Sequence, residues 1–446
     1  MKSSTTMNAV LVQPSPAQTE LLKKWRISTF WVMLIGYIGY YLVRGNLPVA
    51  LPLLSKEFGY TNTQLGYILT FSELCYALGK FTTGPIADQI GGKKIFMLGI
   101  TGAVILNFAF PLYPNLFYFT AVWCIARYFL SMGWGGLTKI IGAWYEPERN
   151  GTIMGIISIN FQLGGSIAAL FAGALIALKV GWKGLFFWPA CLVSVIAIWA
   201  AFASRESPQT VIPNVRFGRN AGLLKAELKF ESANGDKYGV FHVMKGLFQI
   251  PLFRELLVFS FFMHILRSFF MYWIPKFMVD MGMGHVGAAM SSAVFPLAGC
   301  VGTIALGWYT DRHSRKRTSA MWKMLLGSTI AIASIVPLVA YRMEYAWVIV
   351  VLLGIAGFCI YGPYSMTAGC LTLDIAGSEG AGTCSGLLDG FGYIGGTVAS
   401  LGAGIVADVF GWQQVFWSLS FLGLITTLWV AFMSRNRKSI EIERQL

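Results

Sequence analysis

The sequence predicts an all-α membrane protein with twelve transmembrane helices in two pseudo-symmetric six-helix bundles. Hydrophobic residues make up 56% of the 446 residues, and the mean hydropathy is +0.62. Only 12% of the residues are charged, against about 25% in a typical soluble domain. This composition excludes a disordered chain, because plenty of apolar surface is available to bury. It also argues against a soluble enzyme, which needs far more charge to cover its surface.

Twelve apolar segments approach the length of about 20 residues that a spanning helix needs. They cover residues 27–53, 62–85, 95–113, 116–143, 152–178, 183–203, 256–279, 286–309, 320–341, 345–372, 381–407 and 412–434. One long polar connection separates the first six spans from the last six. The predicted units are therefore an N-terminal tail (1–26), an N-terminal half (27–203), a linker (204–254), a C-terminal half (255–434) and a C-terminal tail (435–446).

The basic residues predict how the chain is oriented. Lysine and arginine total 34 against 20 acidic residues, a net charge of +14. With the N-terminus in the cytoplasm, 24 of the 34 basic residues lie in cytoplasmic segments and five in external ones. This bias predicts that both termini and the linker are cytoplasmic. The same bias explains the basic charge, so we expect no nucleic acid as a partner. We expect a monomer in the lipid bilayer of a bacterial inner membrane.

The two halves repeat each other. The stretch Gly84–Asp88 after the second span corresponds to Gly307–Asp311 after the eighth, at an offset of 223 residues. Arg44 in span one and Arg267 in span seven have the same offset. Such a repeat implies two like halves around an axis along the membrane normal, with a binding site at their interface.

Charged and aromatic residues inside the spans mark that site. Tyr37, Tyr41 and Arg44 are spaced i, i+4, i+7 and so share one helix face. A charge inside a span costs about 2.5–3.5 kcal/mol on insertion scales, so it should face a polar cavity. Two arginines from opposite halves can chelate one oxyanion, because a guanidinium fits phosphate or carboxylate. The alternative is that Arg44 and Arg267 each pair with a buried acid.

Two intramembrane acids leave the coupling open. Glu73, Tyr76 and Lys80 are spaced i, i+3, i+7 on one face, and Asp389 lies four residues before Tyr393. Each acid could carry a proton, bind a cationic part of the substrate, or act as a counter-ion. The candidate cations for that pairing are Arg44, Lys80 and Arg127.

Chemistry other than transport finds no support in the motifs. The seven cysteines lie in apolar segments without a CxxC pair, so we expect neither a disulfide framework nor a metal site. The GTCSG run at 382–386 follows no predicted strand and is no nucleophile elbow. No Walker, zinc-helix or dinucleotide motif stands in a valid context. We therefore expect no enzyme and no cofactor.

The connection after span two resembles the loop motif of the major facilitator superfamily. It reads GPIADQIGGKK, and a weaker copy follows span eight. The residues that carry this resemblance are Gly84, Asp88, Gly91, Lys93 and Lys94, with Asp311 and Arg312 in the copy. The resemblance implies the major facilitator fold.

Within that superfamily the chain resembles the organophosphate:phosphate antiporters. The matching pieces are GYIGYYLVRGN (36–46), YALGKF (76–81), MGWGG (132–136), IYGP (360–363) and AGTCSGLLDGFGYIGG (381–396). The resemblance implies a phosphate clamp of Arg44 and Arg267, with Lys80 nearby. It also implies five site tyrosines, which are Tyr37, Tyr41, Tyr76, Tyr361 and Tyr393.

The chain departs from that pattern in the pocket. Gly45 stands where glycerol-3-phosphate transporters have a lysine, and the run Phe161–Gly165 lacks their histidine. His264 replaces a tyrosine three residues before Arg267. Glu73, Asp389 and the span-four Arg127 are additional charges.

The sequence thus predicts a secondary transporter of a small anionic solute that works by alternating access. The resemblance favours an organophosphate exchanged for inorganic phosphate. One alternative is proton-coupled transport of another organic anion, such as a polycarboxylate or a siderophore. A third is a transporter-like membrane sensor of a sugar phosphate, since the family includes such a receptor.

Overall fold

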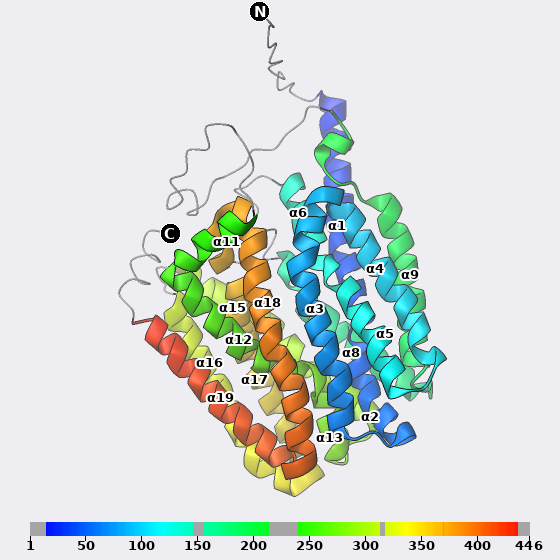
Figure 1. Cartoon of the computed structure of the whole chain (residues 1–446), viewed down its shortest axis with the longest axis vertical. Coiled ribbons are helices and arrows are strands. Elements are labelled where there is room, and N and C mark those ends of the chain that lie inside the picture. Colours follow the sequence, from blue (N-terminus) through cyan, green and yellow to red (C-terminus); the bar gives the residue numbers. More distant parts are fainter. Residues whose placement is uncertain are drawn as a thin grey trace, which may run out of the picture.

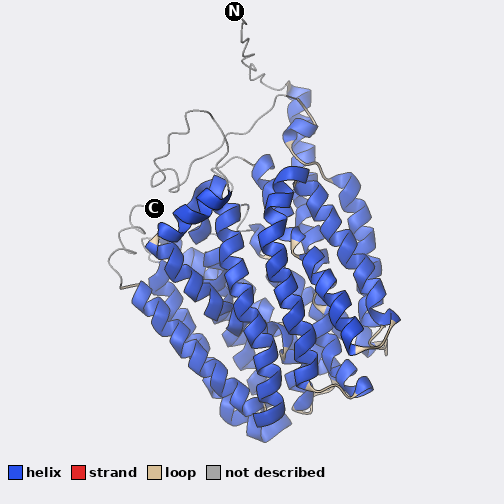
Figure 2. Cartoon of the chain, viewed as in Figure 1, coloured by secondary structure: helices blue, strands red, loops and turns tan. Residues whose placement is uncertain are grey.

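The computed structural model describes residues 15–145, 153, 156–213, 240–312, 317–368 and 370–435. Every regular element in these residues is a helix (Figure 2). Most of the predicted tails and linker therefore lie outside the described residues. So do the side chains of Gly84, Asp88, Asp311 and Arg312 in the loop motif.

The helices form two bundles that stand side by side (Figure 1). The helices of the N-terminal half are α1 (Pro16–Leu42), α2 (Asn46–Phe58), α3 (Asn62–Ile90), α4 (Gly92–Ala109), η1 (Phe110–Leu112), α5 (Leu116–Leu130), α6 (Met132–Trp144), α8 (Asn160–Ala177) and α9 (Gly184–Ala203). The short η2 (Pro208–Thr210) follows them.

The C-terminal half contains the remaining helices. They are α11 (Val240–Gln249), α12 (Pro251–Tyr272), α13 (Ile274–Asp280), α14 (His285–Ser292), α15 (Val294–Arg312), α16 (Arg317–Leu338), η3 (Val339–Tyr345), α17 (Ala346–Ala368), α18 (Cys370–Phe410) and α19 (Trp412–Met433). Each predicted span coincides with one helix or one pair of consecutive helices, although α1 and α18 begin about 11 residues before the expected spans.

One span differs from the others in polarity. Eleven helical segments of the described chain are long and apolar enough to cross a membrane, and α3 is not among them. It carries Glu73 and Lys80 in its middle, yet it packs inside the bundle against α5 and α18. Buried charges in a span are tolerated only where other protein groups solvate them. The site geometry below identifies these groups.

Prolines follow interruptions in three of the spans. Pro48, Pro275 and Pro296 stand near the start of α2, α13 and α15, just after interruptions at residues 43–45, 273 and 293. A proline has no N–H for the carbonyl four residues earlier, and its ring clashes with that carbonyl. The first break leaves Arg44 at the junction between α1 and α2, in the middle of the bundle.

The loop motif makes a structural junction between α3, α4 and α9. Gly91 has φ 97°, which favours glycine, and it ends α3 and begins α4. The Glu206 carboxylate accepts the backbone N–H groups of Gly92 and Lys93 at 2.6 Å each, which caps α4. Lys93 Nζ donates to the carbonyls of Ala201 and Ser204 at the end of α9. Lys94 is exposed.

The two halves meet along α3 and α18, which run antiparallel (Figure 1). Near the start of α3 and the end of α18, Asp408 accepts hydrogen bonds from the backbone N–H and the hydroxyl of Thr63 at 2.6 Å. Further up, the Thr70 hydroxyl contacts the carbonyl of Thr397 at 3.5 Å. The helix pairs α2 with α13 and α8 with α14 also cross the interface. These contacts close the halves against each other below the predicted site.

Candidate functional site

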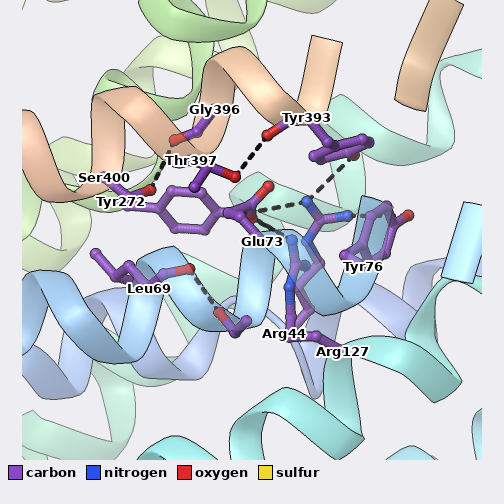
Figure 3. A network of polar contacts seen from close by, with 11 residues as sticks. Arg44, Leu69, Glu73, Tyr76, Arg127, Tyr272, Tyr393, Gly396, Thr397 and Ser400 are labelled. Carbon is purple, nitrogen blue, oxygen red and sulfur yellow. Dashed lines mark hydrogen bonds and ion pairs between the residues drawn. The ribbon is translucent and has the colours of Figure 1, made fainter. Parts of the chain in front are cut away.

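Arg44 lies at the centre of a ring of tyrosines from both halves (Figure 3). Its side chain is only 4% exposed. One guanidinium nitrogen, Nη2, donates to the hydroxyls of Tyr272 at 3.1 Å and Tyr393 at 3.5 Å. The other, Nη1, donates to Tyr76 at 3.5 Å, and the guanidinium lies 4.8 Å from the Tyr76 ring centroid and 5.4 Å from that of Tyr41. Neutral hydroxyls and ring faces therefore solvate this charge.

Arg267 has a corresponding environment in the C-terminal half. It is 2% exposed in the middle of α12. Its guanidinium carbon lies 4.5 Å from the ring centroid of Tyr364 and 5.8 Å from that of Tyr361, both on α17. Its Nε has no hydrogen-bond partner, and no ion pair to Arg267 occurs among the described residues.

The third buried arginine, Arg127 of α5, is neutralised. Its Nη2 forms an ion pair with the Glu73 carboxylate, and both side chains are 1% exposed. Tyr272 of α12 donates its hydroxyl hydrogen to the same carboxylate oxygen and accepts from Arg127 at 3.1 Å. Tyr272 also accepts from Arg44, so one phenol links the ion pair to the predicted clamp across the interface between the halves.

Lys80 is also paired with an acid. Its Nζ lies 3.4 Å from Asp389 Oδ2, with side chains 9% and 16% exposed. Lys80 is on α3 and Asp389 on α18, so this ion pair bridges the two halves. The Lys80 Nζ is also 5.4 Å from the Tyr76 ring centroid. Of the predicted alternatives, the structure therefore shows both acids in contact with cations.

His264 joins the two tyrosine groups. Its imidazole is 5.0 Å from the Tyr393 ring centroid and 5.3 Å from that of Tyr364. Nδ1 lies 2.9 Å from the carbonyl of Ser260, which makes this nitrogen the donor. Nε2 has no partner. His264 thus lies between a tyrosine that binds Arg44 and a tyrosine that covers Arg267.

Tyr37 packs among other aromatic side chains of the site. Its ring packs 5.8 Å from Tyr41 and 5.5 Å from Trp134. Phe161 continues this aromatic chain from Trp134, at 6.1 Å, to Tyr364 in the other half, also at 6.1 Å. No hydrogen bond from the Tyr37 hydroxyl occurs among the described residues, and its assignment to the binding site stays a prediction.

Two residues of this site were not predicted from the sequence. Tyr364 follows Tyr361 by three residues, so helical spacing could have indicated that both lie on one face. Tyr272 follows Arg267 by five residues, a spacing that puts it on a different face of α12, and no pattern in the sequence indicated it. A cross-half hydrogen bond from Gln162 Nε2 to Thr303 Oγ1, at 2.9 Å, was also unforeseen.

The charges of the site do not cancel. Among the described residues, Arg127 forms an ion pair with Glu73 and Lys80 forms one with Asp389, whereas Arg44 and Arg267 have no carboxylate partner. The structure thus places one buried, uncompensated guanidinium in each half. Tyr393 and His264 lie between the residues around Arg44 and those around Arg267. Guanidinium groups in such a low-dielectric setting attract an oxyanion strongly.

The sequence of the chain matches known transporters over most of its length. A glycerol-3-phosphate transporter of Bacillus subtilis (strain 168) is 28% identical over 433 residues, covering 94% of each chain. A Chlamydia pneumoniae protein described as a "probable hexose phosphate transport protein" is 27% identical and covers 89% of this chain and 88% of its own. The membrane sensor protein UhpC of Escherichia coli (strain K12) is 23% identical, with 91% of each chain covered.

Solved structures of transporters share the fold. A bacterial homologue of the human lysosomal transporter Spinster, in an inward-facing and unoccupied conformation, superposes with a TM-score of 0.76 at 15% identity, covering 94% of this chain and 98% of that one. A D-xylose–proton symporter superposes with a TM-score of 0.69 at 12% identity, covering 91% and 97%.

The family model described as Major Facilitator Superfamily matches residues 33–400, which include most of both halves and the whole site. The relatives are the glycerol-3-phosphate and hexose phosphate transporters to which the sequence resemblance pointed. This chain is therefore an integral membrane transport protein that belongs to the Major Facilitator Superfamily.

Proposed function

We propose that the protein is a secondary transporter that exchanges an organophosphate for inorganic phosphate by alternating access. The observation that carries this proposal is the pair of buried arginines, Arg44 and Arg267, that have no carboxylate partner in the part of the chain that the structure describes. Their guanidinium groups supply two positive charges, which balance the dianion of a phosphate monoester. The printed names of the relatives, among them a glycerol-3-phosphate transporter, favour the same substrate class.

The surroundings of the clamp suit a rocking mechanism. Arg44 belongs to the N-terminal half and its hydroxyl partners Tyr272 and Tyr393 belong to the C-terminal half. A phosphate that binds both arginines replaces contacts to neutral hydroxyls with hydrogen bonds between opposite charges, which can also be bidentate. Substrate binding would then draw the halves together around a site at their interface, as in transporters built from repeats.

Reconstituted protein tests this proposal. Vesicles loaded with inorganic phosphate should take up labelled phosphate and labelled glycerol 3-phosphate by exchange, and empty vesicles should not. Arg44→Lys and Arg267→Lys should each lower the exchange rate by tenfold or more, because lysine keeps the charge but loses the two-pronged geometry.

A matched control for these variants is Arg205→Lys. Arg205 donates to backbone carbonyls at the end of α9, outside the site, and its conversion should leave exchange near the wild-type rate. Normal exchange in both clamp variants would contradict the proposal. Ligand binding without any exchange in the wild type would favour the sensor alternative, to which the similarity with UhpC draws attention.

The structure gives little support to proton coupling of another organic anion. A proton carrier must release its proton and remain accessible, whereas Glu73 is buried against Arg127 and Asp389 is held by Lys80. A cation beside a carboxylate favours the charged form. We propose that both acids act as counter-ions. Uptake into phosphate-free vesicles driven by a pH gradient, and abolished by Glu73→Gln or Asp389→Asn, would overturn this assignment.

We further propose that both termini and the linker face the cytoplasm, which is the orientation that the distribution of basic residues favours. In that orientation the contacts of Asp408 with Thr63 lie on the external side. The halves would then be closed toward the outside in this conformation.

A further inference from the structure

The charged side chains around the site obey a simple balance. Among the described residues, four cations surround it, which are Arg44, Lys80, Arg127 and Arg267, and two carboxylates accompany them, Glu73 and Asp389. With a neutral His264 the net charge is +2. Charges buried in a membrane span are costly when they are unpaired, so an excess that persists indicates what the site is built to bind.

The two ion pairs differ in position and exposure. The pair of Glu73 with Arg127 is almost completely buried, at 1% exposure for each side chain. The pair of Lys80 with Asp389 is 9% and 16% exposed, which makes it the more accessible of the two. An incoming ligand can therefore compete with Asp389 for Lys80 more readily than with Glu73 for Arg127.

The pair of Lys80 with Asp389 also lies directly beside the clamp. Lys80 is one helical turn after Tyr76 on α3, and Asp389 is one turn before Tyr393 on α18. The rings of Tyr76 and Tyr393 are 4.5 Å apart, and both hydroxyls contact Arg44. A ligand whose phosphate binds Arg44 therefore places its organic part within reach of this ion pair if it extends along α3 and α18.

We propose that Asp389 determines the charge selectivity of the site by holding Lys80. While this ion pair stands, only the two arginines are uncompensated, so the site suits phosphate esters whose organic part is uncharged. A third negative charge on the ligand would need Lys80 and would strand the Asp389 carboxylate in the span without a partner. This inference rests on the proposed function, because it assumes that Arg44 and Arg267 bind the phosphate.

The physical reason is the cost of the stranded carboxylate. Removing one partner from a buried ion pair leaves a charge that neither water nor protein compensates, which is more costly than losing the contact itself. A carboxylate on the ligand would also stand close to Asp389, and like charges in an interface repel. Both effects penalise a trianion relative to a dianion of similar size.

Two phosphate esters of similar size and different charge provide the test. At pH 8 the phosphate of glycerol 3-phosphate carries close to two negative charges, and 3-phosphoglycerate carries an additional carboxylate. The purified full-length protein is titrated with each, and the ligand-induced rise in the thermal unfolding midpoint gives an apparent dissociation constant. The measured quantity is the ratio of the two constants, which cancels general effects of a variant on stability.

Four variants distinguish a role of Asp389 in charge selectivity from a purely structural role of its ion pair with Lys80. Asp389→Asn frees Lys80 and should shift the ratio toward 3-phosphoglycerate by about tenfold or more. The double variant Lys80→Gln/Asp389→Asn restores the net charge and should return the ratio to within about threefold of wild type. Asp389→Glu keeps the ion pair and should keep the ratio. The matched control is Asp280→Asn, which breaks the pair with Lys276 outside the site and should leave the ratio unchanged.

The outcomes are distinguishable. An unchanged ratio in Asp389→Asn would overturn the inference and leave the proposed function intact. Should that variant not fold, Lys80→Gln alone must shift the ratio the opposite way, because it leaves Asp389 uncompensated; an unchanged ratio there would overturn the inference as well. If neither ester binds the wild type, the proposed function fails. The same charge rule is then tested with succinate and tricarballylate, and equal ratios in wild type and Asp389→Asn would overturn it.

Discussion

Glu73→Gln offers the sharpest test of how the site manages its charges. Glutamine keeps the size and shape of the side chain and removes only the negative charge. In the structure one oxygen of the Glu73 carboxylate accepts hydrogen bonds from Arg127 and Tyr272, while the other oxygen has no partner. The variant therefore leaves Arg127 as a buried cation, and its Nε and Nη1 already lack partners.

The magnitude follows from the burial of the pair. Because both side chains are 1% exposed, solvent does not screen the loss. Removing one partner of a buried ion pair costs about 3–5 kcal/mol. With an unfolding entropy of about 2.1 cal/mol/K per residue, this cost lowers the unfolding midpoint of a 446-residue chain by about 3–5 °C.

The assay is thermal unfolding of the purified protein in detergent at pH 7, with wild type, Glu73→Gln and the double variant Glu73→Gln/Arg127→Gln. The double variant removes both charges and should recover more than half of the loss, because no unpaired ion remains. A protonated glutamic acid has the same shape and charge as glutamine. A midpoint within about 1 °C of wild type in the single variant would therefore mean that Glu73 is protonated at rest, which would refute the ion pair.

Three further predictions concern the interface, the packing and the orientation. Tyr272→Phe removes the phenol oxygen that binds Glu73, Arg44 and Arg127, and should cost about 1–3 kcal/mol of stability, measured by the same thermal assay. Gly302→Val pushes a side chain into the Phe358 backbone of α17 and should cost about 1–3 kcal/mol or more, seen as a smaller folded fraction on size exclusion; Gly307→Ala, which has open space, should match wild type. A cysteine in place of Asn234, in a background without other cysteines, should not react with an impermeant thiol reagent added outside intact cells. Efficient labelling would contradict the predicted orientation.

Much of the architecture was predictable because the bilayer makes simple demands. A span must be long and apolar and must satisfy its own backbone, so hydropathy located all twelve spans. The segment 62–85, which corresponds to α3, was among them, although its charges weaken its apolar character. The interruptions near Pro48, Pro275 and Pro296 were also readable in principle, since proline disrupts the preceding helical turn.

The candidate clamp was predictable in part for the same reason. Arg44 and Arg267 stood out because a charge in a span needs a polar environment, and their equal offset in the two halves suggested a common ligand. Helical spacing placed Tyr76 and Lys80 on one face of α3. In these cases the relevant physics is local to one helix, and the sequence by itself determined which side chains face inward.

Only the tertiary structure decided which charges pair. Glu73 shares a helix face with Lys80, yet its partner is Arg127 on α5, and Lys80 instead binds Asp389 on α18. Helical periodicity gives the direction in which a side chain points. It does not show which helix lies on that side, or which residues of that helix stand at the same level. Tyr272 shows this most clearly, because it reaches Arg44 and Arg127 only once the two halves pack together. The two uncompensated arginines are thus a property of the assembled bundle, since the acids that could have neutralised them are bound elsewhere.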